Sequence, residues 1–434
     1  RLRRDIAAWY YRRGDYPAAE DALGPAPPRR RKADLLAWQD AEAQILLAQG
    51  RMSDALAVLR AAEPQADYAG YVRYFNLGIA EVASGNVLQG LTVLDRVGDI
   101  ASSDAALNAL RDRANLVAGA HFLRQGQGAT AIPLLEKVRD RGADSNTALL
   151  DLGWAWLAPA GVAQNRSMLG DERTVGVPPE SQRLPGWQWD QNQYQRFKLD
   201  PFERARLERG EDERLRHALS IWGELASRPA PDDTVMEANL AIAVKLDQAG
   251  ALKSADDYYG RAIAALEQSL SDLSQAEGYL VGAGAQADLY AAQAGQGFDR
   301  DLHNLPPMPT AYYLRPQLAD WPFVARLADY RDALMLNAQL GGLIQSLQAL
   351  REARCGTEDA AAGNPACADL PPLLDTIGAL QPRLAAAIPD LLQQLQQPLL
   401  QSLAERRRWQ TRLLGDTRLA LARLHDRPAH DAPP

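Results

Sequence analysis

Residues 74–94 read YFNLGIAEVASGNVLQGLTVL, and the placing of the glycines in this stretch predicts two helices in close contact. Gly85 ends the first helix, because glycine takes the left-handed cap conformation without a Cβ penalty. Gly90 lies five residues later and lets the helices approach, and Leu94, one turn further, fills the groove between them. Gly78 lies where the second helix crosses the first. The stretch therefore encodes one helix–turn–helix unit.

The same skeleton occurs five times before residue 260. A turn glycine is followed after five residues by a small residue, and after four more by a bulky one. The five sets are Gly14–Ala19–Leu23, Gly50–Ala55–Leu59, Gly85–Gly90–Leu94, Gly126–Ala131–Leu135 and Gly250–Ala255–Tyr259. The first four glycines are 36, 35 and 41 residues apart. Five copies in phase predict an all-α stack of helix pairs, an α-solenoid, rather than a helical bundle with an accidental phase.

At this point the sequence resembles the tetratricopeptide repeat (TPR) family. That family's motif has an aromatic residue, Leu-Gly and a second aromatic on helix one, then Ala and an aromatic on helix two. The matching residues are Tyr74-Leu77-Gly78, Leu149-Leu152-Gly153-Trp156 and Ala255-Tyr259. The repeat's terminal proline is mostly absent or displaced, as with Pro64 and Pro229. The resemblance covers residues 1 to about 300, and it implies a TPR-like α-solenoid that binds protein segments in its inner groove.

One repeat is split. In LLDLGWAWLAPAGVAQ, residues 149–164, Gly153 lies in the first helix and Pro159 ends it, but no second helix follows directly. The small residue of that second helix is due at position 165. The matching small, bulky and apolar residues occur only further on, at Ala218, Trp222 and Leu225. The register therefore predicts an insertion of 53 residues, the distance from position 165 to Ala218, across the turn of this repeat.

The insert, residues 163–207, is rich in Pro, Gly, Gln and aromatic residues and has little periodicity. A loop of this length in a compact array is usually functional or disordered. Its large aromatic side chains argue against plain disorder. Either they fold back and plug the solenoid, or the loop projects and grips a partner. The candidate partner-binding residues are Trp187, Trp189, Tyr194 and Phe197.

The remaining third loses the repeat skeleton after a proline-rich linker. Three long helical patterns follow, at about 316–354, 370–395 and 399–425, and the second is interrupted by Pro382 and Pro389, which predicts kinks or shorter helices. A long-helix bundle or antiparallel helical hairpin would result, either capping the solenoid or projecting as an arm. The predicted segments are 1–162 (four repeats and the first helix of a fifth), 163–207 (insertion), 208–300 (second helix of repeat five, repeat six and a degenerate half-repeat), 301–316 (linker), 317–427 (C-terminal helical domain) and 428–434 (disordered tail).

The two cysteines, Cys355 and Cys367, flank one polar loop between the first two of these helices. Two thiols around one loop in an otherwise Cys-free chain suggest a disulfide, and hence an oxidising compartment. The alternative is two unrelated free thiols. A zinc site is not expected, because no further cysteine is present and no histidine lies nearby.

Charge argues against nucleic acid as a partner, because the formal net charge of the chain is −8. One basic face is nevertheless expected on the last helix. It consists of Arg406, Arg407, Arg408 and Arg412, with Arg418 and Arg423 beyond. Such runs are mostly solvated or paired with nearby acids, and the alternative is binding to an acidic partner or to phospholipid headgroups.

No catalytic constellation is evident. The five histidines are scattered, and the chain has no G-x-S-x-G, phosphate-loop or H-E-x-x-H motif. We therefore expect no enzyme activity, no metal and no cofactor. The groove candidates are Arg73 and Asn76, beside the packed Tyr74 and Leu77. An enzyme of the lytic-transglycosylase type, which also uses a helical superstructure, would need a carboxylate of the insert in a closed pocket. The candidates for that role are Glu180, Asp190 and Glu203.

The expected function is that of a protein-binding scaffold. What the resemblance implies is an accessory subunit of a bacterial cell-envelope machine, such as a secretion, pilus, polysaccharide-export or transport assembly, with other proteins of that complex as its partners. The expected compartment is the periplasm. No stretch is apolar enough to span a membrane, and residue 1 is Arg, so an N-terminal segment that was removed could supply an anchor. The alternative is a cytoplasmic TPR adaptor or co-chaperone.

Overall fold

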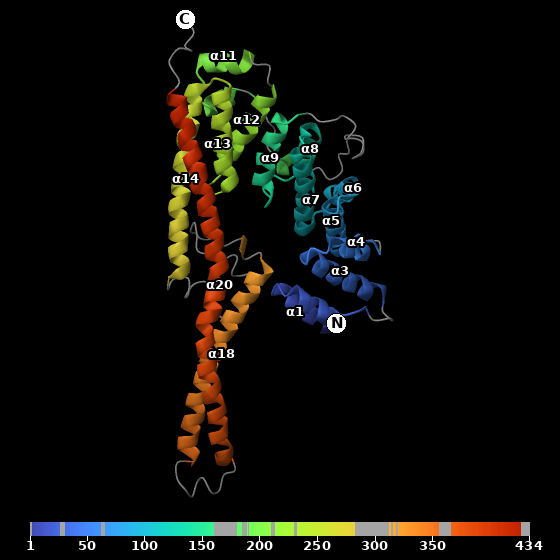
Figure 1. Cartoon of the computed structure of the whole chain (residues 1–434), viewed down its shortest axis with the longest axis vertical. Coiled ribbons are helices and arrows are strands. Elements are labelled where there is room, and N and C mark those ends of the chain that lie inside the picture. Colours follow the sequence, from blue (N-terminus) through green and yellow to red (C-terminus); the bar gives the residue numbers. More distant parts are fainter. Residues whose placement is uncertain are drawn as a thin grey trace. The chain divides into compact units, whose positions relative to one another are not determined.

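The computed structural model describes residues 2–26, 31–61, 66–159, 180–184, 189, 191–209, 213–229, 232–282, 312–313, 316–317, 320–355 and 366–426. Across these residues the protein is built from α-helices, and the only pairing of β type is an isolated bridge between Arg139 and Arg183. The predicted all-α class is confirmed (Figure 1). None of the helices in these ranges combines the length and the hydropathy that a membrane crossing requires.

The chain forms two compact units. The first comprises Arg1–Ala8, Tyr16–Ser269 and Thr411–Pro434, and the second comprises Trp9–Asp15 and Leu270–Gln410. Three helices contribute to both units: α1 (Leu2–Arg12), α14 (Leu252–Val281) and α20 (Ala366–His425).

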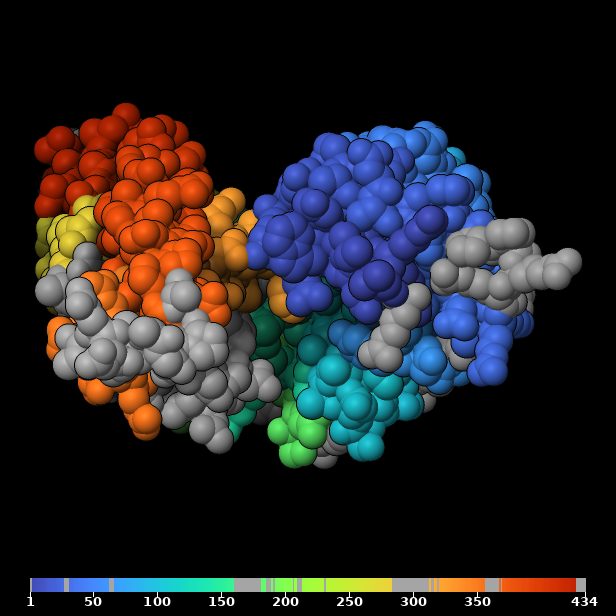
Figure 2. All heavy atoms as spheres, turned by 90° about the horizontal axis from the view of Figure 1, so that it is seen from below, coloured from blue at the N-terminus to red at the C-terminus, as the bar shows by residue number. Residues whose placement is uncertain are grey.

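The first unit is a succession of packed helix pairs. Its helices are α2 (Tyr16–Leu23), α3 (Lys32–Ala48), α4 (Met52–Arg60), α5 (Tyr68–Ala83), α6 (Val87–Gly98), α7 (Ala105–Arg124), α8 (Gly128–Leu135), α9 (Ser145–Leu157), α12 (Glu213–Ala226) and α13 (Asp233–Gln248). Helix α3 packs on α4, α5 on α6 and α7 on α8, and each pair contacts the next. Figure 2 shows the N-terminal helices, in blue, as a closely packed body.

The turn glycines have the backbone conformation that the sequence predicts. Gly14, Gly50, Gly85, Gly126 and Gly250 all have a positive φ, between 66° and 87°. A residue with a Cβ is disfavoured there, because its side chain collides with the backbone. The small and bulky residues that follow each turn glycine are buried. Apart from Gly90, each of them has an exposed fraction of at most 2%. The sequence skeleton therefore corresponds to real turns and real helix contacts.

Close helix approaches repeat at a fixed spacing. A Cβ on Gly78 would lie 2.7 Å from Leu94 Cγ, and a Cβ on Gly119 would lie 2.7 Å from Leu135 Cγ. In both cases the bulky residue follows the glycine by 16 positions. Gly153 makes the same kind of contact with Trp222, 69 positions later, and a Cβ there would lie 2.1 Å from Trp222 Nε1. The additional distance is 53 residues, so α9 and α12 pack as the register predicts.

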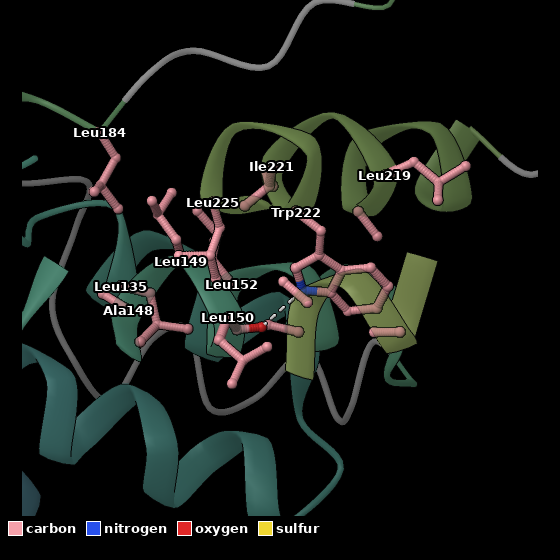
Figure 3. Close-up of a cluster of buried hydrophobic side chains, with 14 of the residues drawn as sticks. Leu135, Ala148, Leu149, Leu150, Leu152, Leu184, Leu219, Ile221, Trp222 and Leu225 are labelled. Atoms are coloured by element: carbon pink, nitrogen blue, oxygen red, sulfur yellow. Dashed lines mark hydrogen bonds between the residues drawn. The ribbon is translucent and has the colours of Figure 1, made fainter. Parts of the chain in front are cut away.

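The α9–α12 pair is fixed by a buried core. Trp222 is fully buried, and its Nε1 donates a hydrogen bond of 3.1 Å to the backbone oxygen of Leu150 (Figure 3). Leu149, Leu152 and Leu225 line the same cluster. A buried indole N–H that lacked an acceptor would cost free energy, so this bond also fixes the orientation of the ring.

The described part of the insert folds back onto this core. It contains the 3₁₀ turn η2 (Glu180–Gln182) and two short helices, α10 (Gln191–Arg196) and α11 (Pro201–Arg209). Four buried apolar side chains in or beside these elements join the core cluster of the first unit: Leu184, Phe197, Leu199 and Leu207. These residues therefore pack against the helix pairs, as in the first alternative, and do not project toward a partner. Trp187 lies outside the described residues.

The second unit contains a long hairpin. Helix α18 (Trp321–Cys355) packs on the first half of α20, and their core includes Phe323, Leu327 and Leu395. The Cα atoms of Cys355 and Cys367 are 5.8 Å apart, which places the pair at disulfide distance. The residues between 356 and 365 lie outside the described ranges.

One expectation about this hairpin is wrong. The sequence predicts kinks or shorter helices at Pro382 and Pro389 and a separate last helix from about residue 399. The shorter helices and the separate last helix are not found, because α20 is one helix of 60 residues. It contains Pro371, Pro372, Pro382, Pro389 and Pro398. Each proline removes one backbone hydrogen bond, yet its fixed φ is compatible with a helix. Buried leucines on both sides of Pro398, Leu395 and Leu399, hold the backbone in place there.

Candidate functional site on α7, α9 and α13

The first helices of successive pairs lie in a row. Helix α9 contacts α7 on one side and α13 on the other, while α8 and α12 pack behind them. Asp151 and Trp154 on α9 and Glu237 on α13 are half-buried, so these first helices keep part of their side-chain surface exposed. Because α7, α9 and α13 are neighbours in space, they can bring together polar side chains that are far apart in the sequence.

Trp154 lies on this row, and the core behind it holds it in place. Its ring is half-buried, and its centroid lies 4.7 Å from that of Trp222 in an edge-on arrangement. Lys245 of α13 places its Nζ 6.0 Å from the Trp154 ring centroid. Because Trp222 is itself fixed by the bond to Leu150, Trp154 is a rigid aromatic platform, and rigid aromatic residues are favoured in protein recognition.

Two carboxylates from different helices lie beside this platform. Burial and, to a smaller extent, the charge of the nearby Glu237 raise the pKa of Asp151 on α9 to about 6, although Arg124 acts in the opposite direction. Burial also raises the pKa of Glu237 on α13, while a hydrogen bond with the Trp154 side chain lowers it. Both acids are thus partly desolvated, and the charge of Glu237 disfavours the ionised form of Asp151.

Helix α7 contributes basic groups to the edge of this site. Burial lowers the pKa of His121, and the charge of Arg124 lowers it further. Asp151, Glu237, Trp154, His121 and Arg124 are together called the inner-face cluster below. A cationic side chain entering beside the two acids would stabilise their ionised forms, and each pKa unit recovered is worth about 1.4 kcal/mol. Among the described residues, no group of three or more potential ligands could hold a metal ion.

Of the two groove candidates predicted from sequence, Arg73 is used within the fold. Arg73 is 3% exposed and binds Asp40 and the backbone oxygens of Val58 and Leu59, at 2.7 and 3.1 Å for the two oxygens. It therefore joins neighbouring helices instead of presenting a charge to a ligand. Asn76 is half-buried on α5. The expectation for Arg73 was wrong because a long side chain can turn back along the helix to reach backbone acceptors.

The insert aromatics are also used within the fold. Trp189 stacks on Phe197 at 5.6 Å, and Phe197, fully buried, lies 5.6 Å from Tyr258. Tyr194 donates a hydrogen bond of 2.6 Å to Glu208, and Arg204 lies over its ring. These three predicted partner-binding residues therefore stabilise the unit in which they lie.

Glu203, one of the three candidate carboxylates, is a helix cap. Its side chain accepts bonds of 3.0 and 3.1 Å from the backbone nitrogens of Lys253 and Ser254 in the first turn of α14, and another from the Ser254 hydroxyl. It also accepts a bond from the Asp200 nitrogen, which completes a capping box at the start of α11. Asp190 and the Glu180 side chain lie outside the described residues.

The predicted basic face is only partly available. Arg406 lies 4.9 and 5.1 Å from the rings of Tyr312 and Tyr313, and Arg407 binds Glu277 at 2.6 Å. Arg408 and Arg412 are exposed. Arg406 and Arg407 thus contact groups distant in sequence within the second unit, in line with the expectation that such runs are mostly solvated or paired with nearby acids. Binding of an acidic partner by these arginines stays a prediction.

Sequence reasoning missed the inner-face cluster. Trp154 directly follows the packed Gly153, and a large aromatic residue beside a packed glycine was a usable signal. The meeting of Asp151 with Glu237 had no such signal, since 86 residues separate them.

Comparison with known proteins gives no further identification: no protein-family model, no curated protein and no solved structure matches the chain. The functional argument therefore depends on the residues of the site.

Proposed function

We propose that this chain is a non-enzymatic protein-binding scaffold with a TPR-like α-solenoid, and that the inner-face cluster holds a partner segment with a basic side chain. The observation that carries the proposal is the pair of half-buried acids, Asp151 and Glu237, beside the platform of Trp154. A partner's lysine or arginine would bind between the acids and stack its aliphatic stem on the indole.

The energetics of the pair support a binding role. Burying a carboxylate disfavours its charged form, so Asp151 costs stability at neutral pH. Proteins retain such groups where function needs them, and groups with perturbed pKa values concentrate at functional sites. A neutral residue in place of Asp151 would be the more stable choice if the position served folding alone.

We further propose that the protein works in the bacterial periplasm as an accessory subunit of an envelope assembly. The support is the pair Cys355 and Cys367 at disulfide distance, which fits an oxidising compartment. Thiol titration of denatured protein from its native source should find no free thiol before reduction and two after it. Two free thiols before reduction would contradict the assignment to that compartment.

The binding role is tested by affinity purification from native cells after mild cross-linking. The double variant Asp151→Asn/Glu237→Gln removes both charges and retains side-chain volume. A partner retained by the wild type should be reduced at least about tenfold in the variant, because a buried charged contact is lost.

A matched control removes a charge elsewhere. Asp21→Asn changes an exposed acid on α2, which is a second helix of a pair. It should leave the recovered partner unchanged. Equal recovery with all three proteins would contradict the proposed site, and loss with Asp21→Asn would point to net charge as the cause.

A further inference from the structure

The hairpin of the second unit has a defined antiparallel register. A Cβ on Gly341 would lie 3.3 Å from Gln381 Nε2, and Cys355 and Cys367 lie at disulfide distance. These two contacts are fourteen residues apart on both helices. Each step forward along α18 therefore corresponds to one step back along α20, and this register sets Leu350 within one residue of Leu373, and Leu343 within one residue of Leu380.

Five leucines of this hairpin are exposed at heptad spacing. On α18 they recur every seven residues, and on α20 two more are again seven apart. Their exposed fractions are between 44% and 47%. The set, called the leucine face below, is Leu336, Leu343, Leu350, Leu373 and Leu380.

The five side chains lie on one side of the hairpin. Leu343 immediately precedes the half-buried Ile344 on α18, and Leu380 immediately precedes the half-buried Gln381 on α20. Two antiparallel helices are related by a two-fold axis perpendicular to their common plane, so residues with the same place relative to the seam share one side. Residues that directly follow a seam residue lie on the opposite side, and at this level they include Gly342 and Gly378. The exposed leucines therefore lie on one side of the hairpin only.

The pattern is wider than a two-helix contact requires. A two-stranded coiled coil needs two apolar positions in seven, and a third apolar position next to the seam is characteristic of helices in a larger bundle. In the hairpin that third position is the leucine face. The pattern thus indicates that further helices, which a single hairpin lacks, pack against this side.

We propose that the leucine face binds the leucine face of a second copy of this chain, forming an intermolecular four-helix bundle. The α18 part of the face has no charge for a foreign partner to recognise, because residues 333–350 contain no Asp, Glu, Lys, Arg or His. On α20 the face is flanked by one acid and one base, Asp369 and Arg383, which a two-fold symmetric copy would also supply. A second copy supplies leucines at the same spacing and on the same two levels. Such a self-complementary face is what a two-fold symmetric dimer uses.

The face is large enough for a dimer. From Leu336 to the hairpin tip α18 runs about 30 Å, and two helices side by side are roughly 20 Å wide, which gives an outline of roughly 600 Å². The solvent-accessible area of such an uneven face is larger than its projected outline. The area is therefore close to the ~800 Å² that each partner contributes to a standard interface.

The test is sedimentation of the full chain over a range of concentrations. The wild type should form a dimer, and Leu343→Glu/Leu380→Glu, which puts charge at the centre of the face, should be a monomer up to about 100 µM. The control Gln345→Glu/Ala379→Glu adds the same charges at exposed positions of the same helices, outside the leucine face. It should leave the dissociation constant unchanged within about threefold.

A milder variant separates loss of contact from loss of folding. Leu343→Ala/Leu380→Ala retains helix propensity and should raise the dissociation constant at least about tenfold with unchanged helix content. A wild type that stays monomeric overturns the proposal, including one that binds lipid vesicles or another protein through these leucines. A dimer that the glutamate pair does not weaken overturns it as well, since another surface would then join the copies.

Discussion

At the scale of the residue, the fold depends on glycines that admit a bulky neighbour. Gly153 is the extreme case, because Trp222 occupies the place where its side chain would begin. The same arrangement joins Gly78 with Leu94. Each such contact brings two helix backbones together, so the tolerance for one added methyl is small.

Gly153→Ala should lower the free energy of unfolding of the first unit by about 1–3 kcal/mol, because the new Cβ overlaps the Trp222 ring. The control is Gly260→Ala on α14, where nothing lies within 4 Å of the added Cβ. It should be neutral or stabilising by up to about 1 kcal/mol, since alanine favours a helix. Chemical denaturation followed by tryptophan fluorescence measures both. Equal effects would show that the packing at Gly153 is looser than described.

His217 should make stability depend on pH. Burial lowers its pKa to about 4, with Arg216 adding to the shift, so the unfolded state binds more protons than the folded state between pH 4 and 6.5. Stability is then fully present above pH 6.5 and is lost as pH falls through this window. His217→Phe, which retains a ring against Trp156, should reduce that loss by about 1–3 kcal/mol. An unchanged pH profile would contradict the neutral, buried state of the histidine.

Asp151 changes the pH dependence of stability in the direction opposite to His217. Its pKa is raised to about 6, so the folded state binds more protons than the unfolded state between pH 4 and 6, and stability falls as pH rises through that window. Asp151→Asn should therefore stabilise the protein by about 1–2 kcal/mol at pH 7.5, after allowance for solvent screening, and by almost nothing at pH 4. Denaturation midpoints at both pH values measure it. Destabilisation at pH 7.5 would mean that Asp151 serves folding.

At the scale of the element, the insert contributes to stability. Phe197 at the end of α10 lies in the core, while Phe202 on α11 is 76% exposed. Phe197→Ala should cost about 3–5 kcal/mol, whereas Phe202→Ala should change stability by at most about 0.5 kcal/mol. Thermal unfolding of the two variants gives a direct comparison. Similar losses would contradict the described packing, and no loss from Phe197→Ala would mean that the insert does not plug the core.

The helices of the first unit and their pairing could be predicted from the sequence. The continuity of α20 and the polar contacts between distant residues could not. Turn glycines and the spacing from Gly153 to Trp222 are local or periodic signals, so register alone pairs α9 with α12. The continuity of α20 through Pro389 depends on packing that no local pattern encodes. Arg73 and Arg406 find acceptors and rings through long-range contacts, and the meeting of Asp151 with Glu237 is of the same kind.

At the scale of the whole molecule, the chain offers two distinct surfaces. The inner-face cluster belongs to the first unit and is charged and aromatic, and the leucine face belongs to the second unit and consists of exposed leucines. Their chemistry suits different tasks, namely capture of a basic partner segment and association of copies. A scaffold with both properties would present its binding face twice, which raises avidity without new contacts.

The central claim is that the inner face of α7, α9 and α13 holds a partner, and site-specific photo-cross-linking in native cells tests it most directly. A photoreactive phenylalanine analogue at position 154 should yield a discrete cross-linked protein, which Asp151→Asn/Glu237→Gln should abolish. The same probe at Trp409, which is exposed on α20, should not capture that protein. No cross-link from position 154, or the same product from both positions, would contradict the account.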